Sequence, residues 1–167
     1  MSMQLVKSND PVLRTPTTEF LDTEIPLLGE LIFSMFSTLE VKGGIGLAAP
    51  QIGVDRSIFV IDIDNVRKVF INPTIVDTST GMEDQVEGCL SLPGLQLKVK
   101  RPSSITVMWL DEDGNKQISD LDGLWARCWL HEYDHLQGIM IDDRVSKLTL
   151  SIARKKLEKK QRLGKRN

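Results

Sequence analysis

The only two histidines of the chain lie in one pentapeptide, His-Glu-Tyr-Asp-His, at residues 131–135. Residues four apart on an α-helix lie about 40° apart around the helix axis, so both imidazoles can reach one divalent metal ion. Glu132, between them, can accept a proton from a water bound to that ion. The pentapeptide therefore predicts a helix with a hydrolytic metal site. The competing interpretation is two ordinary histidines among surface charges.

The residues around the pentapeptide fit a helix. Asp122 is a suitable N-cap, and Gly138 is a suitable left-handed residue just after the C-terminal end. The sequence thus predicts a helix from Asp122 to about Gln137, with both histidines in its second half.

Further helices are predicted near both ends of the chain. Over 26–41 the apolar residues fall on one helical face, and Gly43 with the glycine that follows it ends the helix. Ser146 can cap a final helix from 147 to about 163, which ends at Gly164.

Between these helices the sequence predicts short strands. The predicted strands are 57–63, 69–72, 95–100, 105–110 and 116–121, and the turn Asp-Glu-Asp-Gly-Asn at 111–115 closes a hairpin between the last two. This order of elements indicates an α+β fold, with mostly antiparallel sheets around the central helix that carries the pentapeptide. A length of 167 residues suits one domain, so we expect a single catalytic domain over 1–167.

Two histidines need a third ligand. The pentapeptide continues as the zinc-protease pattern HExxHxxGxxH would, but Ile141 stands where its third histidine belongs, and this excludes that pattern. A thermolysin-like site would use a later carboxylate. The carboxylates after residue 140 are Asp142, Asp143 and Glu158, and their sequence context favours none of them.

The two cysteines are better candidates. Cys128 lies three residues before His131 on the same helix, and one helix cannot easily supply three ligands to one ion, so Cys128 is expected to be a small buried residue. Cys89 lies between Gly88 and Pro93 in a segment expected to be a tight loop. A loop thiolate with two helix imidazoles would leave a fourth position open for water, as catalysis requires.

Two alternatives remain open at this point. A closed structural zinc site would use both cysteines and both histidines, although the cysteines lie 39 positions apart and not in the paired spacing usual for such sites. A metallopeptidase of another lineage is the alternative enzyme.

Three segments together resemble the signature motifs of peptide deformylases. They are GIGLAAPQ at 44–51, EGCLS at 87–91 and HEYDH at 131–135, in matching order and spacing. The resemblance implies a metal-dependent hydrolase that removes the formyl group from the N-terminal N-formylmethionine of nascent polypeptides. It also implies that Cys89, His131 and His135 hold one divalent ion. The implied ion is Fe²⁺, with Zn²⁺, Ni²⁺ or Co²⁺ able to replace it.

The resemblance also implies roles for the neighbouring residues. Glu132 would take the proton of the attacking water, while the Gln51 side-chain amide and the Leu90 backbone N–H would stabilise the charge on the formyl oxygen. Glu87 would orient a ligand imidazole, or it would simply form an ion pair with Arg101.

The substrate pocket is implied in the same way. Ile45 and Gly46 would offer backbone hydrogen bonds to an extended peptide, and Leu124 with the stem of Arg127 would form an apolar slot for the methionine side chain. The alternative for Leu124 is a place in the hydrophobic core.

The charge of the chain is distributed unevenly. Residues 154–167 hold eight basic residues and one acid, a net of +7, so the other residues carry −9 of the total −2. Such a basic helix either aids solubility or meets a polyanion, and the resemblance implies the ribosome.

Residues 1–10 lack the apolar core of a signal peptide, and no run is long enough to span a membrane. We therefore expect a cytoplasmic protein, without a membrane or a DNA partner.

Overall fold

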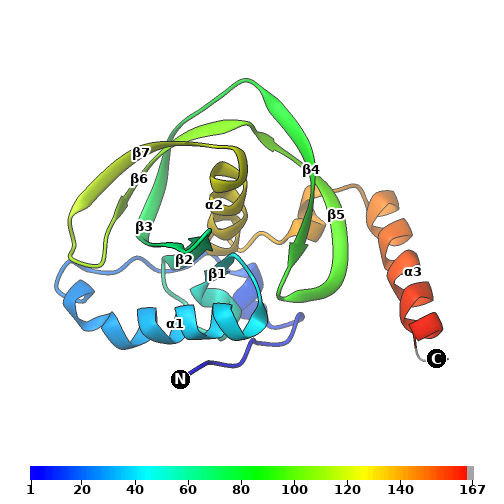
Figure 1. The fold of residues 1–167 in the computed structure, drawn as a ribbon, viewed down its shortest axis with the longest axis horizontal. Helices are drawn as coiled ribbons and strands as arrows, with labels where there is room; N and C mark the ends of the chain where they lie inside the picture. The colour runs from blue at the N-terminus through cyan, green and yellow to red at the C-terminus, as the bar shows by residue number, and fades with distance from the viewer. Residues whose placement is uncertain (165–167) are drawn as a thin grey trace.

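The computed structural model describes residues 1–164 (Figure 1). Its α-helices are α1 (Gly29–Lys42), α2 (Gly123–Leu136) and α3 (Lys147–Gly164). One antiparallel sheet has the strand order β1 (Gly46–Ala48), β2 (Ile58–Ile63), β3 (Val66–Thr78), β6 (Ser104–Leu110) and β7 (Lys116–Asp122). Strands β4 (Met82–Cys89) and β5 (Leu92–Pro102) pair with each other in a separate ribbon. Short 3-10 helices lie at Pro11–Arg14, Ile25–Leu27, Ala49–Ile52 and Ile141–Arg144.

This arrangement confirms the expected α+β fold with antiparallel sheets around a central helix. All the strand pairs in residues 1–164 are antiparallel. In Figure 1, α2 stands between the sheet and the β4–β5 ribbon, α1 runs along the base, and α3 lies beyond the ribbon.

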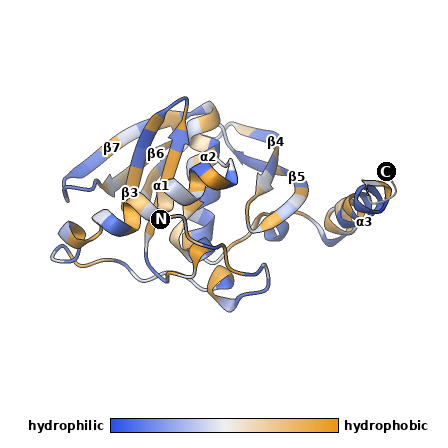
Figure 2. Ribbon diagram, turned by 60° about the horizontal axis from the view of Figure 1, so that its bottom comes forward, coloured by the Kyte–Doolittle hydropathy of each residue, from blue (hydrophilic) through white to orange (hydrophobic). Residues whose placement is uncertain are grey.

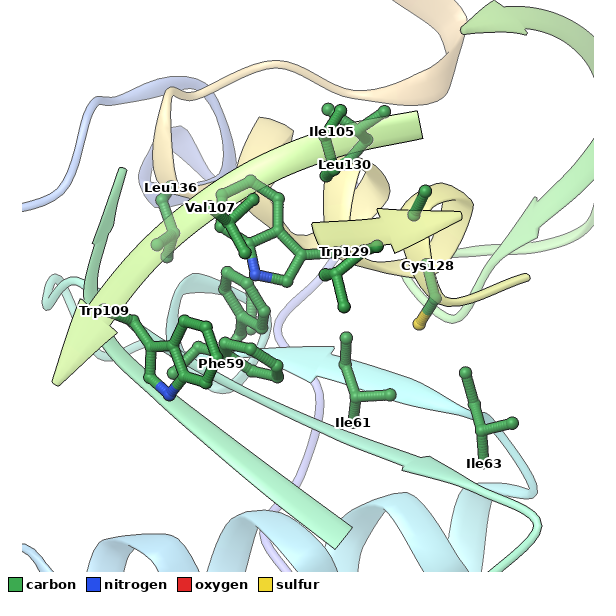
Figure 3. Close-up of a cluster of buried hydrophobic side chains, with 14 residues drawn as sticks. Phe59, Ile61, Ile63, Ile105, Val107, Trp109, Cys128, Trp129, Leu130 and Leu136 are labelled. Carbon is green, nitrogen blue, oxygen red and sulfur yellow. The ribbon is translucent and has the colours of Figure 1, made fainter. Parts of the chain in front are cut away.

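Strand β2 shows why the sheet forms here. Its sequence, Ile-Phe-Val-Ile-Asp-Ile, is apolar on both faces because the strand is covered on both sides. Phe59 and Ile61 belong to the core cluster around Trp129 of α2 (Figure 3), whereas Ile58 and Val60 belong to the cluster under α1. The rings of Phe59 and Trp129 meet edge to face with their centroids 5.5 Å apart. Helix α2 is therefore fixed against the sheet by aromatic packing.

The ribbon is an excursion of the chain between two strands of the sheet. Strand β3 pairs with β6, and the chain between them leaves the sheet, forms β4 and β5, and returns. Where the chain leaves and re-enters the sheet, the Ser79 backbone N–H donates a hydrogen bond of 3.0 Å to the Ser104 carbonyl. The ribbon thus reaches the far side of α2 from the sheet.

In the ribbon, the structure differs from the sequence-based prediction. Strand β4 was not predicted, and the segment 87–94, expected as a tight loop, consists of the two strand ends and a turn at Leu90–Ser91. Strand β4 escapes prediction because most of its residues are exposed and its apolar residues do not alternate with polar ones as in a half-buried strand. The short β1 was also missed.

The helix ends follow the sequence with two corrections. Gly138 is left-handed, with φ of 70°, and α2 ends just before it, as predicted. Asp122 occupies the N-cap position, but its side chain makes no capping hydrogen bond, so the predicted cap is wrong in its chemistry. Helix α1 begins at Gly29 and not at 26, because residues 25–27 form a 3-10 turn. Its predicted end is confirmed by left-handed Gly43.

Helix α3 is capped as predicted, since the Thr149 N–H donates to the Ser146 hydroxyl over 3.1 Å. No residue within α3 is buried. Its contact with the body runs through Leu150, Ala153 and Leu157, which pack on the buried cluster of the ribbon. The helix projects from the molecule and carries both polar and apolar residues (Figure 2), and Leu148, Ile152 and Leu163 are exposed. Lys165 and Arg166 of the basic segment lie outside the described residues.

Candidate metal centre

The three expected ligands converge in the structure. Cys89 ends β4, while His131 and His135 lie one turn apart on α2. One ligand atom from each of the three lies within 4.8 Å of the others. The Cys89 Sγ is 3.4 Å from the His135 Nε2. A ribbon and a helix from distant parts of the sequence thus supply one thiol and two imidazoles to the same point.

The hydrogen bonds fix which nitrogen of His131 faces that point. Its Nδ1 lies 2.9 Å from the Glu87 Oε2, and a carboxylate only accepts hydrogen bonds, so Nδ1 carries the proton. The lone pair of Nε2 is then free to bind a metal, the usual arrangement for a ligating histidine with a carboxylate partner.

Glu87 contacts both partners considered from the sequence. Besides His131, it accepts two hydrogen bonds from the Arg101 guanidinium, at 2.6 and 2.9 Å. Burial raises the pKa of this carboxyl, but the hydrogen bonds from Arg101 and His131 outweigh burial and hold the pKa at about 2. Glu87 is therefore an anion that orients the imidazole and raises its basicity.

Glu132 is buried beside the ligands, with 3% of its surface exposed. Its Oε2 has no hydrogen-bond partner within residues 1–164, and burial raises the pKa of its carboxyl to about 7. A Cβ on Gly46 would lie 2.8 Å from the Glu132 Cδ and 2.8 Å from the Cys128 Sγ. The glycine of the first motif thus leaves room for a carboxylate that is poised to exchange a proton.

Gln51 has a defined orientation. Its Oε1 accepts a hydrogen bond from the Ala48 backbone N–H over 2.8 Å, which turns the amide nitrogen toward the ligands. That nitrogen lies 3.7 Å from the Cys89 Sγ and 3.2 Å from the Ser91 hydroxyl. The amide therefore directs its N–H groups toward the Cys89 thiol and the Ser91 hydroxyl.

A cavity of about 510 Å³ opens over these groups. It is lined by all the site residues expected from the sequence except the buried His135, namely Ile45, Gly46, Gln51, Cys89, Leu90, Leu124, Arg127, His131 and Glu132. Strand β4 adds lining residues that the sequence reasoning missed, among them Gln85 and Val86. These were overlooked because β4 itself was not recognised.

Leu124 and Arg127 both line the cavity but differ in burial. Leu124 is 53% exposed, so a place in the core is wrong for it. Arg127 lines the cavity, yet its guanidinium is buried and binds the Glu87 carboxylate over 2.8 Å.

Cys128 stands apart from the ligand cluster. It is buried in the core cluster with Trp129, and among the described residues only Cys89, His131 and His135 form a group able to hold a metal. Burial raises the pKa of the Cys128 thiol well above its usual value, which keeps it protonated. A group of one thiol and two imidazoles, without Cys128, has the composition of a catalytic site, which keeps a fourth position for water, and not of a closed structural one.

The family model of polypeptide deformylases matches residues 2–151. The chain belongs to this family. The deformylase of Rhizorhabdus wittichii is 42% identical, and the match covers 99% of both chains. Among solved structures, the deformylase of Legionella pneumophila has a TM-score of 0.87 at 37% identity, over 100% of this chain and 99% of that one. The Synechococcus elongatus deformylase also has a TM-score of 0.87, at 41% identity, and the match covers 93% of this chain and 86% of that one.

Peptide deformylases are metal-dependent hydrolases that remove the N-formyl group from nascent peptides, and this is the activity of the chain. The resemblance drawn from the three sequence motifs is confirmed. Within residues 1–164 no helix is long and apolar enough to cross a membrane.

Proposed function

We propose that Cys89, His131 and His135 hold one divalent ion and that deformylation takes place in the cavity above them. The convergence of the three ligand atoms within 4.8 Å, beside the buried Glu132 carboxylate, carries this assignment. A bound ion would lower the pKa of its water and polarise the formyl carbonyl.

Glu132 takes the proton of the attacking water and later delivers it to the leaving amine. Its raised pKa, about 7, suits both steps, because the group can hold or release a proton near neutral pH. The Gln51 Nε2 and the Leu90 backbone N–H donate to the formyl oxygen as negative charge develops on it. We propose that this oxygen lies between the two donors, which flank Cys89.

The substrate lies in the cavity as an extended chain. The backbone of Ile45 and Gly46 offers it hydrogen bonds, and Leu124 with the stem of Arg127 receives the methionine side chain. A neutral formamide suits such a site, whereas a free α-ammonium would bring positive charge toward the cation.

The ion is proposed to be Fe²⁺. A thiolate with two imidazoles also accommodates Zn²⁺, Ni²⁺ and Co²⁺, since each accepts mixed sulfur and nitrogen ligands. Protein purified without oxygen should contain iron and lose activity in air, because both ferrous iron and thiolate oxidise. Activity that is stable in air with the native ion would contradict the choice of iron.

Hydrolysis of formyl-Met-Ala, compared with free Met-Ala, tests the reaction. We expect formate release from the first peptide and no cleavage of the second. Cleavage of the Met-Ala bond would favour a metallopeptidase instead. Inactivity on both peptides would favour a structural metal site.

We propose that residues 1–167 form one catalytic domain in the cytoplasm, and that its basic C-terminal helix binds the ribosome. The family match ends at residue 151, near the start of α3, and this helix exposes most of its surface. Its excess of positive charge would neutralise several ribosomal phosphates, giving an affinity that falls steeply with salt.

A further inference from the structure

The buried apolar residues of the ribbon that carries Cys89 and those of α2 belong to different clusters. The buried apolar cluster of the ribbon consists of Leu13, Cys89, Leu95, Leu97, Val99, Met140 and Ile141, and contains no α2 residue among those described. The buried apolar residues of α2, such as Trp129 and Leu130, belong to the cluster against the sheet. Polar contacts between the ribbon and α2 are therefore candidates for setting the distance between the Cys89 strand and the helix with both histidines.

Arg101 reaches from the ribbon to the helix. It continues the inward face of β5 after Leu97 and Val99, and only 3% of its surface is exposed. One edge of its guanidinium holds Glu87 of the neighbouring strand, while its Nη1 donates to the Asp134 Oδ2 over 2.8 Å. A single buried cation thus joins β5, β4 and α2.

Arg127 reaches in the opposite direction, from the helix to the ribbon. Its Nη1 donates to the Glu87 Oε1 over 2.8 Å and to the Val99 carbonyl over 3.0 Å. Its Nη2 donates to the Glu83 carbonyl over 2.8 Å. This guanidinium therefore holds both strands of the ribbon.

Both arginines act on carboxylates next to the ligands. Glu87 lies two residues before Cys89 and accepts a hydrogen bond from His131. Asp134 immediately precedes His135. Charge-assisted hydrogen bonds of this kind are short and directional, and in a buried setting they are not replaced by water. Through Glu87 and Asp134, the two arginines can thus influence the positions of all three proposed ligands, although neither arginine is itself a ligand.

We propose that Arg101 and Arg127 are positioning residues that set the Cys89 thiolate against the two imidazoles. The proposal rests on the ligand set of the proposed function. Loss of such supporting contacts typically weakens metal binding 10–100-fold.

The test measures the affinity of folded, metal-free protein for Co²⁺ by competition with a chelator, together with the ligand-field spectrum of the cobalt form. Arg101→Met and Arg127→Met keep an apolar stem but lose the guanidinium. Arg144→Met is the matched control, because Arg144 also holds Asp134 but is half-exposed and makes no hydrogen bond to the ribbon among the described residues. We expect Co²⁺ to bind about 10–100-fold more weakly to the first two variants, with a shifted spectrum, and within about threefold of wild type in the control.

A merely structural role would lower the unfolding temperature and leave both the affinity and the spectrum of the folded protein unchanged, and that result would overturn the proposal. If Arg101→Met does not fold, Arg101→Lys serves instead, because it keeps the charge but lacks the planar guanidinium that holds Glu87 through two nitrogens and Asp134 through the third. Affinity equal to wild type would again overturn the proposal. Failure of wild type itself to bind Co²⁺ would instead contradict the ligand set.

Discussion

Replacing Glu132 with glutamine separates catalysis from stability. The amide has nearly the same shape as the carboxylate but cannot take a proton from water. General acid–base catalysis typically contributes about 10²–10⁴-fold, which corresponds to roughly 3–5 kcal/mol in the activation barrier. We therefore expect Glu132→Gln to retain its metal and to lose turnover on formyl-Met-Ala by that factor.

The same substitution should stabilise the metal-free protein at high pH. Burial raises the pKa of the Glu132 carboxyl from 4.5 to about 7, so the ionised form is less stable in the folded protein than in the unfolded chain. This penalty is absent below about pH 4.5 and complete above about pH 7, where it amounts to on the order of 3 kcal/mol. Glutamine removes the charge and with it the penalty.

Two measurements check this pair of expectations. The unfolding temperature of metal-free Glu132→Gln should be higher than that of wild type at pH 8 and close to it at pH 5. Glu112 is exposed, so the unfolding temperature of Glu112→Gln should match that of wild type at both pH values. Turnover of Glu132→Gln within threefold of wild type would refute the role of Glu132 as the base. Equal stability of the two proteins at pH 8 would refute the argument from burial.

Three further outcomes are expected. Gln51→Ala should fold and bind metal but lose about 10²–10³-fold in kcat, the usual effect of one lost oxyanion donor; a pure rise in KM would show that Gln51 only holds substrate. Gly46→Ala should lose most activity because its Cβ would press on Glu132, whereas Gly29→Ala, with nothing within 4 Å, should not. Truncation after Ser151 should preserve turnover on a short formyl-peptide but weaken co-sedimentation with ribosomes at low salt; equal co-sedimentation would exclude the helix as the anchor.

The candidate metal ligands could be proposed from sequence because their chemistry depends on local patterns. The two histidines lie at helical spacing, and Cys89 was preferred to Cys128 because a third ligand must come from outside the helix. The structure brings these three ligand atoms together, with Cys128 outside the group.

The ribbon and its ion pairs were less accessible to sequence reasoning. Strand β4 has few residues that favour strands, so its extended form depends mainly on pairing with β5. One signal for Arg101 was present, since it falls in register with Leu95, Leu97 and Val99 on the buried face of β5. A charged residue at such a position requires a buried partner, but the identity of that partner depends on tertiary structure.

In the proposed metal site, a thiolate from the ribbon completes the set of ligands on the helix. Metal content after dialysis of Cys89→Ala and Cys128→Ala tests it most directly. We expect Cys89→Ala to lose the metal, because Cys89 is one of the three proposed ligands. Cys128→Ala should keep about one ion per chain, because all three proposed ligands remain in place. Equal loss of metal from both variants would contradict this account and indicate a closed four-ligand site.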